Sequence, residues 1–341
     1  MDAVDFQAIP KVALHDHLDG SVRPQTLLEL GLQCGVALPA STPELLALEV
    51  AKRAHSGSLE SYLEAFNWTI PVMQTRQALT RIARESIEDL AADGVVLAEI
   101  RFAPLLHITN GLSPQQVIDA VVDGLRQGAA LTGIPAGVIL CGLRSNDEFD
   151  QVVELFRENY RPGSLVVGVD LAGPEHGFPV SAHPAIAQFA KSMLRAPITL
   201  HAGEAYGVES IWQAVNAGAR RIGHGTHLID DILADRKLLR VILDRDILLE
   251  VCLSSNHQTG GVSSIAAHPV QRFIEEGVKV VLDTDNRLMS ATTHSQEYAL
   301  AHKNFGLTRS TLTTLARNGV HASFLPQHRK QAVLANYFSA T

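Results

Sequence analysis

Residues 11–20 read KVALHDHLDG, a short apolar run that ends in two histidines, His15 and His17. The run has the length and composition of a buried β-strand, and a period of two places both imidazoles on the same side of it. Because the run is apolar without strict alternation, we expect a parallel strand that is covered on both faces. This stretch therefore predicts a buried strand with two imidazoles at its carboxyl end.

Seven further strand-like runs follow, separated by longer amphipathic stretches. They are residues 95–104, 136–143, 164–173, 197–204, 221–224, 247–255 and 278–285. Between them, residues 113–131 open with Ser-Pro-Gln-Gln, which is typical of a capped helix start. Eight strands that alternate with helices predict a closed (β/α)8 TIM barrel. An open doubly wound sheet is the alternative, but it would need a glycine-rich phosphate turn after the first strand, and none follows it.

Two segments do not fit this repeat. Residues 38–93 separate the first two strands and carry an apolar pattern, Leu59, Tyr62, Leu63 and Phe66. An insertion after a barrel strand lies over the catalytic face, so we expect a helical lid there; a helix packed on the barrel flank is the simpler alternative. Residues 294–341 predict additional C-terminal helices. No linker or low-complexity run divides the chain, so we expect residues 1–341 to form a single domain.

The composition excludes several classes of function. Of the 341 residues 46% are hydrophobic and 19% are charged, an ordinary balance for a globular protein with a large core. The formal net charge is −8 without a basic cluster, so we expect no nucleic-acid partner. No apolar stretch reaches the ~20 residues of a spanning helix, so we expect no membrane partner.

The cysteines and the N-terminus favour a cytoplasmic location. Cys34, Cys141 and Cys252 lie far apart and form no CxxC pair, as expected in a reducing compartment. The first ten residues lack the basic and apolar regions of a secretory signal. The sequence leaves the oligomeric state open.

Polar residues gather at the carboxyl ends of the predicted strands, where barrel enzymes have their active sites. His15 and His17 end the first strand, His201 ends the fifth, and Asp285 ends the eighth. Three neutral imidazoles and one carboxylate are suitable ligands for zinc, although iron or cobalt could bind the same set. An HxH pair alone more often consists of ordinary core or surface histidines. All four residues at these strand ends predict one catalytic zinc ion per chain.

Two further residues lie beside the predicted metal site. His224 ends the sixth strand, between the strands that supply His201 and Asp285, which favours a catalytic histidine over an ordinary core histidine. Glu204 follows His201 by three residues, close enough to face the ion without binding it. A carboxylate that caps the next helix is the alternative for Glu204.

The motifs in this order resemble those of the adenosine deaminases of the amidohydrolase superfamily, in particular a bacterial branch. The markers are His15-Asp16-His17-Leu18-Asp19-Gly20, Asp170-Leu171-Ala172-Gly173, His201-Ala202-Gly203-Glu204, Gly223-His224-Gly225 and Ser254-Ser255-Asn256. The resemblance runs from Pro10 to the C-terminal helices. It implies zinc-dependent hydrolytic deamination of adenosine and 2′-deoxyadenosine to the inosines and ammonia, a reaction of purine salvage.

The resemblance also implies roles for the catalytic residues. Zinc would lower the pKa of a bound water, Asp285 would take its proton, and His224 would orient and stabilise the resulting hydroxide. Glu204, kept protonated in a water-poor pocket, would donate to purine N1 and make C6 electrophilic.

For the substrate, the resemblance places the backbone N–H of Gly173 at purine N3, and Asp19 and His17 near the ribose 5′-hydroxyl. A simple turn glycine is the alternative for Gly173. Related adenine deaminases carry a motif similar to His-Leu-Glu-Gly after the first strand and lack Asp-Leu-Ala-Gly. Asp19 and residues 170–173 therefore favour a nucleoside over the free base.

Asn286 departs from the family pattern, in which a second aspartate follows the metal-binding one and hydrogen-bonds purine N7. N7 is an acceptor, so an aspartate must be protonated to donate to it, whereas an asparagine amide donates at any pH. We therefore expect Asn286 to preserve purine binding.

Three other functions are alternatives to this one. A deaminase of another 6-aminopurine nucleoside, such as aminodeoxyfutalosine, would need room for a bulky 5′ group beside Asp19 and the lid. A non-catalytic nucleoside-binding relative would not need Glu204 and all four metal ligands, which this chain has. The cytidine deaminase fold requires HxE with PCxxC, and the sequence contains no such pair.

Overall fold

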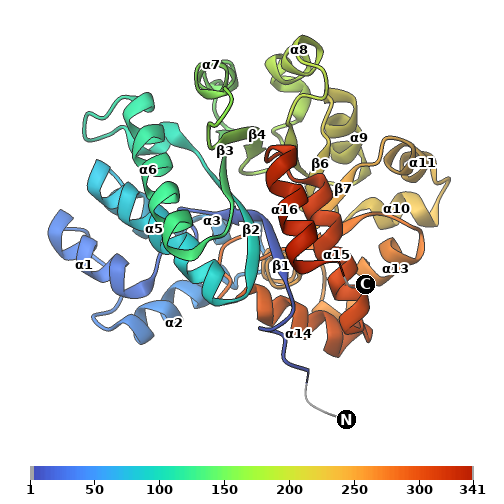
Figure 1. The fold of residues 1–341 in the computed structure, drawn as a ribbon, viewed down its shortest axis with the longest axis horizontal. Helices are drawn as coiled ribbons and strands as arrows, with labels where there is room; N and C mark the ends of the chain where they lie inside the picture. Colours follow the sequence, from blue (N-terminus) through green and yellow to red (C-terminus); the bar gives the residue numbers. More distant parts are fainter. Residues whose placement is uncertain (1–3, 340–341) are drawn as a thin grey trace.

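The computed structural model describes residues 4–339, and in them eight strands run parallel at the centre of the molecule (Figure 1). The strands pair in sequence order as two groups of four. The first group is β1 (Lys11–His17), β2 (Val95–Phe102), β3 (Ala136–Leu143) and β4 (Val166–Ala172). The second group is β5 (Thr199–Ala202), β6 (Arg221–His224), β7 (Leu248–Val251) and β8 (Val280–Leu282).

Two single bridges close these groups into a barrel. Val169 of β4 pairs with Ile198, just before β5, and Asp16 of β1 pairs with Asp285, just after β8. All pairings between neighbouring strands are parallel, which requires a crossover between each strand and the next. The (β/α)8 TIM barrel predicted from the sequence is therefore confirmed.

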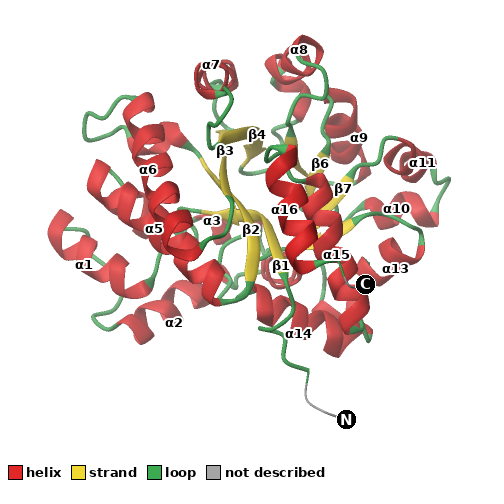
Figure 2. Cartoon of the chain, viewed as in Figure 1, coloured by secondary structure: helices red, strands yellow, loops and turns green. Residues whose placement is uncertain are grey.

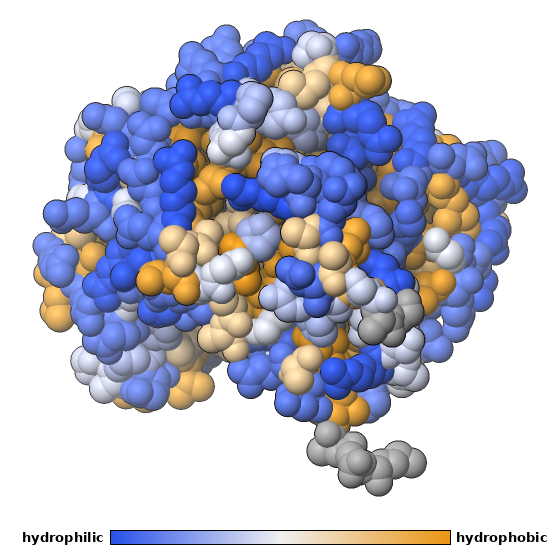
Figure 3. All heavy atoms as spheres, in the orientation of Figure 1, coloured by the Kyte–Doolittle hydropathy of each residue, from blue (hydrophilic) through white to orange (hydrophobic). Residues whose placement is uncertain are grey.

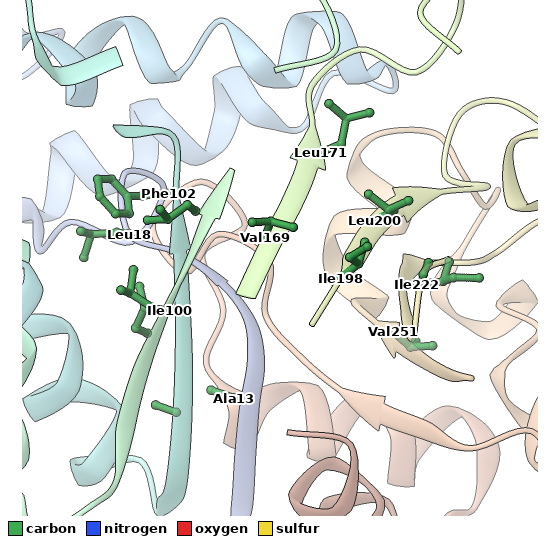
Figure 4. Close-up of a cluster of buried hydrophobic side chains, with 14 of the residues drawn as sticks. Ala13, Leu18, Ile100, Phe102, Val169, Leu171, Ile198, Leu200, Ile222 and Val251 are labelled. Carbon is green, nitrogen blue, oxygen red and sulfur yellow. The ribbon is translucent and has the colours of Figure 1, made fainter. Parts of the chain in front are cut away.

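The alternation of side chains along the strands separates an apolar layer from a polar interior. Residues such as Ile100, Phe102 and Leu200 belong to the main apolar cluster, which extends into the surrounding helices (Figure 4). Their neighbours in sequence, Arg101 and His201, point the other way, because successive side chains of a strand lie on opposite faces. The helix-facing layer provides the core, and the barrel interior can hold polar groups.

Five of the predicted strands are shorter than expected, namely β2, β4, β5, β7 and β8, and the largest differences are in the last three. β7 ends at Val251, and helix α12 (Leu253–Gln258) replaces the second half of the predicted strand 247–255. The first turn of α12 is held by a residue distant in the sequence. Ser254 donates both its backbone N–H and its hydroxyl to the buried carboxylate of Glu297. β8 spans only Val280–Leu282 of the predicted 278–285. The residues that follow each strand therefore form the rim of the barrel.

The long segment after β1 is helical. It contains α1 (Pro24–Cys34), α2 (Pro43–Ala54), α3 (Leu59–Leu63), α4 (Phe66–Thr69), the short 3-10 helix η1 (Ile70–Val72) and α5 (Arg76–Ala92). Helix α5 packs along α6 (Pro114–Thr132) and contacts β2, so it belongs to the outer ring of helices. The alternative of a helix packed on the barrel flank therefore describes α5. Residues of α3 and α4 instead line the cavity described below.

The other helices surround the strands or, in the case of the last two in the chain, lie across one end of them (Figure 2). They are α7 (Phe149–Asn159), α8 (Pro184–Ser192), α9 (Val208–Ala217), α10 (Leu228–Leu233), α11 (Lys237–Asp244), α13 (Val270–Glu275), α14 (His294–Phe305), α15 (Arg309–Ala322) and α16 (Gln327–Tyr337); three further 3-10 turns are η2 (Pro104–His107), η3 (Val180–Ala182) and η4 (Ile265–Ala267). The Ser113–Gln116 capping box at the start of α6 is present as predicted.

The C-terminal helices cover the amino ends of the strands. Helix α15 contacts β1 and β8, and α16 contacts β2. A second apolar cluster joins Val12 of β1 and Leu248 of β7 to Leu325 and Val333 of this C-terminal segment. The barrel is thus sealed at one end, and its carboxyl end is left for the site.

The outer surface is mostly hydrophilic on the face shown in Figure 3. Among the described helices, none is both long and apolar enough to cross a membrane.

Candidate active site

A cavity of about 280 Å³ lies at the carboxyl ends of the strands. Polar groups from three strand ends face it, namely His201 in β5 and Glu204 after it, His224 of β6 and Asp285 after β8. All eight residues predicted to contact substrate also line the cavity: His17, Asp19, Leu59, Tyr62, Leu63, Phe66, Gly173 and Asn286. The residues that the sequence assigned to substrate contact therefore lie together around one cavity.

The predicted metal ligands come together below this cavity. One ligand atom each of His15, His201, His224 and Asp285 lies within 4.8 Å of the others. His17 joins the same cluster, because its Nε2 is 3.2 Å from Nε2 of His201 and 3.4 Å from Oδ1 of Asp285. The cluster thus contains five candidate ligands, one more than the sequence assigned to the metal.

Closure of the barrel positions three of these residues. The backbone N–H of Asp285 donates to the carbonyl oxygen of His15 at 2.9 Å, and the N–H of His17 donates to the carbonyl of Asp285 at 2.7 Å. Asp285 adopts a φ of 61°, which is unfavourable for a residue with a side chain. The two hydrogen bonds between β1 and the end of β8 offset this strain and aim the carboxylate at the imidazoles.

Buried carboxylates orient two of the imidazoles from behind. Nδ1 of His15 lies 2.9 Å from Oε2 of Glu250, and Nδ1 of His201 lies 3.0 Å from Oδ2 of Asp170. Each imidazole therefore donates through Nδ1 and presents the lone pair of Nε2 to the cluster. Nε2 of His15 is fully buried and has no hydrogen-bond partner among the described residues. An orphaned lone pair of this kind fits a metal ion.

Arg101 joins these two carboxylates inside the barrel. Its Nη1 lies 2.8 Å from Asp170 and its Nη2 lies 2.7 Å from Glu250, and all three side chains are fully buried. Burial opposes the ionisation of Glu250, but the guanidinium groups of Arg101 and Arg221 outweigh it and lower the pKa of Glu250. Glu250 therefore remains an anion that accepts from His15.

A chain of hydrogen bonds sets the tautomer of His224. The backbone N–H of Val270, which can only donate, points to Nδ1 of His268 at 3.1 Å, so the proton of His268 is on Nε2. That Nε2–H donates to Oδ1 of Asn256 at 3.2 Å, and the amide nitrogen of Asn256 donates to Nδ1 of His224 at 2.9 Å. The proton of His224 is therefore on Nε2, which faces Glu204 at 3.5 Å.

This tautomer distinguishes His224 from the residues that can bind a metal. Burial lowers the pKa of the His224 imidazole well below its usual value, so the ring is neutral. A neutral imidazole with its proton on Nε2 has no lone pair at that atom to give to a metal. The donor set that fits a metal ion is then His15, His17, His201 and Asp285, and His224 is left as a hydrogen-bond donor.

Glu204 and Asp285 carry carboxyl groups in opposite protonation states. Burial, followed by the charges of Asp285 and Glu175, raises the pKa of Glu204 to about 8, and its Oε1 has no partner in the described part of the chain. Asp285 accepts from the Ser255 hydroxyl at 2.6 Å through Oδ2, which leaves Oδ1 at 3.3 Å from Nε2 of His15. One carboxyl is suited to donate a proton and the other to accept one.

The lining of the substrate cavity combines apolar and polar side chains. Tyr62 of α3 is buried and its hydroxyl lies 2.8 Å from Oγ of Ser290, in the segment after β8. Gly173 has a φ of +97°, which favours glycine. A Cβ on Gly20 would lie 1.7 Å from Oδ1 of Asn286, so only glycine leaves room for that side chain.

Charge in the cavity comes from acidic groups. Among the described residues that line it, none is lysine or arginine. Asp19 is buried, and burial raises its pKa to about 7. The cavity therefore offers no counter-charge to an anionic group on a ligand.

The residues behind the ligands were not predicted from the sequence. Glu250 is the one charged residue of β7, and Arg101 shares the otherwise apolar β2 with Glu99; a charge in a fully buried strand is a signal that could have found them. Asn256 and Asp170 stood in recognised motifs without a role. His268 gave no sequence signal, because its partner Asn256 is reached only through the fold.

Comparison with known proteins identifies the family. The family model described as adenosine deaminase matches residues 10–338. The chain belongs to the adenosine deaminase family. Adenosine deaminase 1 of Streptomyces coelicolor is 41% identical over 339 residues, which cover 95% of this chain and 85% of that protein.

Solved structures of other deaminases and of Arabidopsis ADAL share the fold. The adenine deaminase of Arthrobacter aurescens superimposes with a TM-score of 0.85 at 25% identity, covering 96% of this chain and 98% of that chain. Arabidopsis ADAL, solved as a complex with IMP, gives a TM-score of 0.84 at 30% identity, covering 98% of each chain. The resemblance inferred from the motifs is confirmed, and membership of the family together with the histidine–aspartate cluster indicates a catalytic metal.

Proposed function

We propose that this chain catalyses the zinc-dependent hydrolytic deamination of adenosine and 2′-deoxyadenosine to the inosines, with release of ammonia, in purine salvage. The observation that carries the proposal is the position of Glu204. Its buried carboxyl lies 3.5 Å from Nε2 of His224, beside the metal-ligand cluster and on the wall of the cavity. A protonated carboxyl and an imidazole N–H beside a metal-activated water are suited to add water to a purine ring.

The spacing of the ligand atoms supports zinc. Four ligands held tetrahedrally at the usual 2.0–2.1 Å lie about 3.3 Å apart. The separations His17 Nε2–His201 Nε2, His15 Nε2–Asp285 Oδ1 and His17 Nε2–Asp285 Oδ1 are 3.2, 3.3 and 3.4 Å. We assign His15, His17, His201 and Asp285 as the zinc ligands. When bound, zinc supplies a water molecule that loses a proton near neutral pH.

Three side chains then move the protons. Asp285 accepts the proton of the attacking water, and Nε2–H of His224 donates to the oxygen that adds to C6. Glu204 donates its proton to N1 as the C6–N1 double bond becomes single. The amino group leaves as ammonia with the proton taken up by Asp285, and the hydroxyl proton at C6 returns to Glu204. The products are inosine and ammonia, and both carboxyl groups end as they began.

The cavity lining supports a nucleoside substrate. The backbone N–H of Gly173 is assigned to N3, the amide of Asn286 to N7, and Asp19 and His17 to the ribose 5′-hydroxyl. Oδ1 of Asn286 lies against Gly20, which leaves the amide nitrogen for N7. The lining without lysine or arginine favours an uncharged nucleoside over a 5′-monophosphate, whereas Arabidopsis ADAL was solved with the nucleotide IMP.

Helices α3 and α4 are proposed as a lid. The cavity lining includes Leu59, Tyr62, Leu63 and Phe66, and these side chains would exclude water from the ring. We also propose that residues 1–341 form one domain, because the main apolar cluster runs from Leu27 of α1 to Leu315 of α15. Unpaired thiols at Cys34, Cys141 and Cys252 support a cytoplasmic location.

The test is a substrate panel with protein of measured metal content. We expect turnover of adenosine and 2′-deoxyadenosine, and much weaker turnover of AMP, adenine and a nucleoside with a bulky 5′ group. Glu204→Gln, which keeps the shape but holds no acidic proton, should lose at least 10²-fold in kcat. If zinc-loaded protein deaminates none of the panel, the function is wrong. Wild-type rates in Glu204→Gln would refute the mechanism alone.

A further inference from the structure

Glu175 lies outside the cavity lining but binds the loop that carries Glu204. It follows β4 two residues after Gly173, and only 3% of it is exposed. Its carboxylate accepts five hydrogen bonds, from the backbone N–H groups of Gly203 (2.6 Å), Glu204 (3.0 Å), Ala205 (2.7 Å) and Tyr206 (2.9 Å) and from the hydroxyl of Ser210.

Four successive N–H groups that converge on one point form an anion-binding turn. Such a turn requires an acceptor that can receive several donors, and an ionised carboxylate offers about four lone-pair positions. Hydrogen bonds to an ionised acceptor are about twice as strong as neutral ones. The conformation of residues 203–206 therefore depends on the carboxylate of Glu175.

A second contact holds the loop after β4 against strand β5. Arg144 is buried, and it donates to the carbonyl oxygen of Phe178 at 2.9 Å and to that of His201. Phe178 belongs to the loop after β4, and His201 lies in β5. The loop after β4 is thus held to β5 through a guanidinium and to the loop that follows β5 through a carboxylate.

The two loops carry the two groups assigned to the six-membered ring of the purine. Gly173 donates to N3 from the loop after β4, and Glu204 donates to N1 from the loop after β5. N1 and N3 are separated by a single carbon of the ring, so both bonds form together only if the spacing of the two donors is fixed. A displacement of about 1 Å at a reacting group can cost roughly 10²-fold in rate.

We propose that Glu175 is a positioning residue that fixes the spacing between the N3-binding and N1-binding groups, and so orients the purine for attack at C6. It acts through the backbone of residues 203–206 and does not touch the substrate. This inference rests on the proposed deamination, because the roles of Gly173 and Glu204 come from it.

The experiment compares Glu175→Gln with Glu175→Asp and with Ser210→Ala. Gln keeps the size but replaces one acceptor by an NH₂ group that faces the same donors, whereas Asp keeps the charge. Ser210→Ala removes one donor and leaves the four N–H contacts. We expect kcat to fall on the order of 10²-fold in Glu175→Gln with KM changed much less, a partial recovery in Glu175→Asp, and a change below about 3-fold in Ser210→Ala. The amount of metal bound per chain should be the same in wild type and in the three variants.

Amide hydrogen exchange at residues 203–206 provides a readout that does not need turnover. Exchange there should be faster in Glu175→Gln than in wild type, and close to wild type in Ser210→Ala. Unchanged exchange, or a kcat in Glu175→Gln within about 3-fold of wild type, would overturn the proposal. If wild-type protein fails to deaminate adenosine while exchange responds as expected, the proposed function is wrong and the loop contact remains. If Glu175→Gln does not fold, Glu175→Asp is used for the test. If kcat and the amount of bound metal then fall by the same factor in Glu175→Asp, the proposal is also overturned.

Discussion

Arg101 and His15 share one carboxylate oxygen: Oε2 of Glu250 lies 2.7 Å from Nη2 of Arg101 and 2.9 Å from Nδ1 of His15. All three side chains are fully buried. A buried anion that accepts from an imidazole must be compensated, and Arg101 provides this charge while it also binds Asp170 behind His201. One guanidinium therefore supports two of the proposed metal ligands.

Replacing Arg101 should weaken metal binding. In Arg101→Met, Asp170 and Glu250 lose their shared cation, so we expect a loss of about 10–100-fold in metal affinity and of about 3–5 kcal/mol in stability. Chelator competition measures the first and urea unfolding the second. Arg101→Lys keeps the charge but cannot contact Asp170 and Glu250 through two separate nitrogens. Its metal affinity and its stability should lie between those of wild type and Arg101→Met. Wild-type metal affinity in Arg101→Met would contradict this role.

Replacing Asn256 should move the proton of His224. The carboxylate in Asn256→Asp cannot donate, so it would accept from Nδ1–H of His224 and leave Nε2 without a proton to donate to the attacking oxygen. We expect kcat to fall by 10²-fold or more, comparable to other reversals of an imidazole tautomer. The ¹⁵N chemical shifts of His224 report the tautomer directly. An unchanged tautomer in Asn256→Asp would disprove the hydrogen-bond chain from Val270.

Replacing Asn286 should make substrate binding depend on pH. An ionised aspartate cannot donate to N7, so Asn286→Asp should raise KM for adenosine by up to about tenfold at neutral pH, in line with the loss of one hydrogen bond. The increase should shrink at lower pH, as the carboxyl becomes protonated. 7-Deazaadenosine, which lacks the N7 acceptor, is the control, and wild type and variant should bind it alike. Unchanged KM and kcat for adenosine would rule out the N7 contact.

Acid should destabilise the metal-free protein through buried histidines. Burial lowers the pKa of His107 to about 4 and that of His268 to about 3, whereas both titrate near 6.5 in the unfolded chain. Below pH 6.5 the unfolded chain binds protons that the folded chain does not, so the free energy of unfolding falls as pH drops from 6.5 toward 4. Urea unfolding at pH 7 and pH 5 with excess chelator measures this loss.

His107→Phe supplies the matched variant for the acid experiment. It removes one of the two titrating groups and should show a smaller loss of stability between pH 7 and pH 5 than wild type. An equal loss in both proteins would show that His107 is not neutral in the folded state.

Much of the fold and the site follows from the sequence, because both depend on periodicity and order. The apolar runs with polar residues at their ends predicted the strands of the barrel and placed His15, His201 and Asp285 at one end of it. Segment ends were less predictable: the strand predicted through residue 255 stops at Val251, because Ser254 bonds to Glu297, which is 43 positions away. A contact of that kind leaves no local pattern.

The residues that orient the metal ligands and the catalytic groups could not be predicted from the sequence for the same reason. Glu175, Glu250 and His268 each act through a partner on another strand or loop, and one sequence does not reveal which carboxylate faces which donor. The tautomer of His224 is the clearest case. It depends on a backbone N–H of Val270, a group that every residue except proline carries.

The two single bridges that close the barrel have a mechanical consequence. They divide the strands into half-barrels, β1–β4 and β5–β8, that share no continuous ladder. The proposed metal ligands lie on both sides of this division, with His15 and His17 on the first half and His201 and Asp285 on the second. A bound ion would therefore act as a cross-link between the halves. Stripping the metal should accelerate native-state proteolysis at the β1–β8 junction, and two separately expressed halves should reassemble more tightly when metal is supplied.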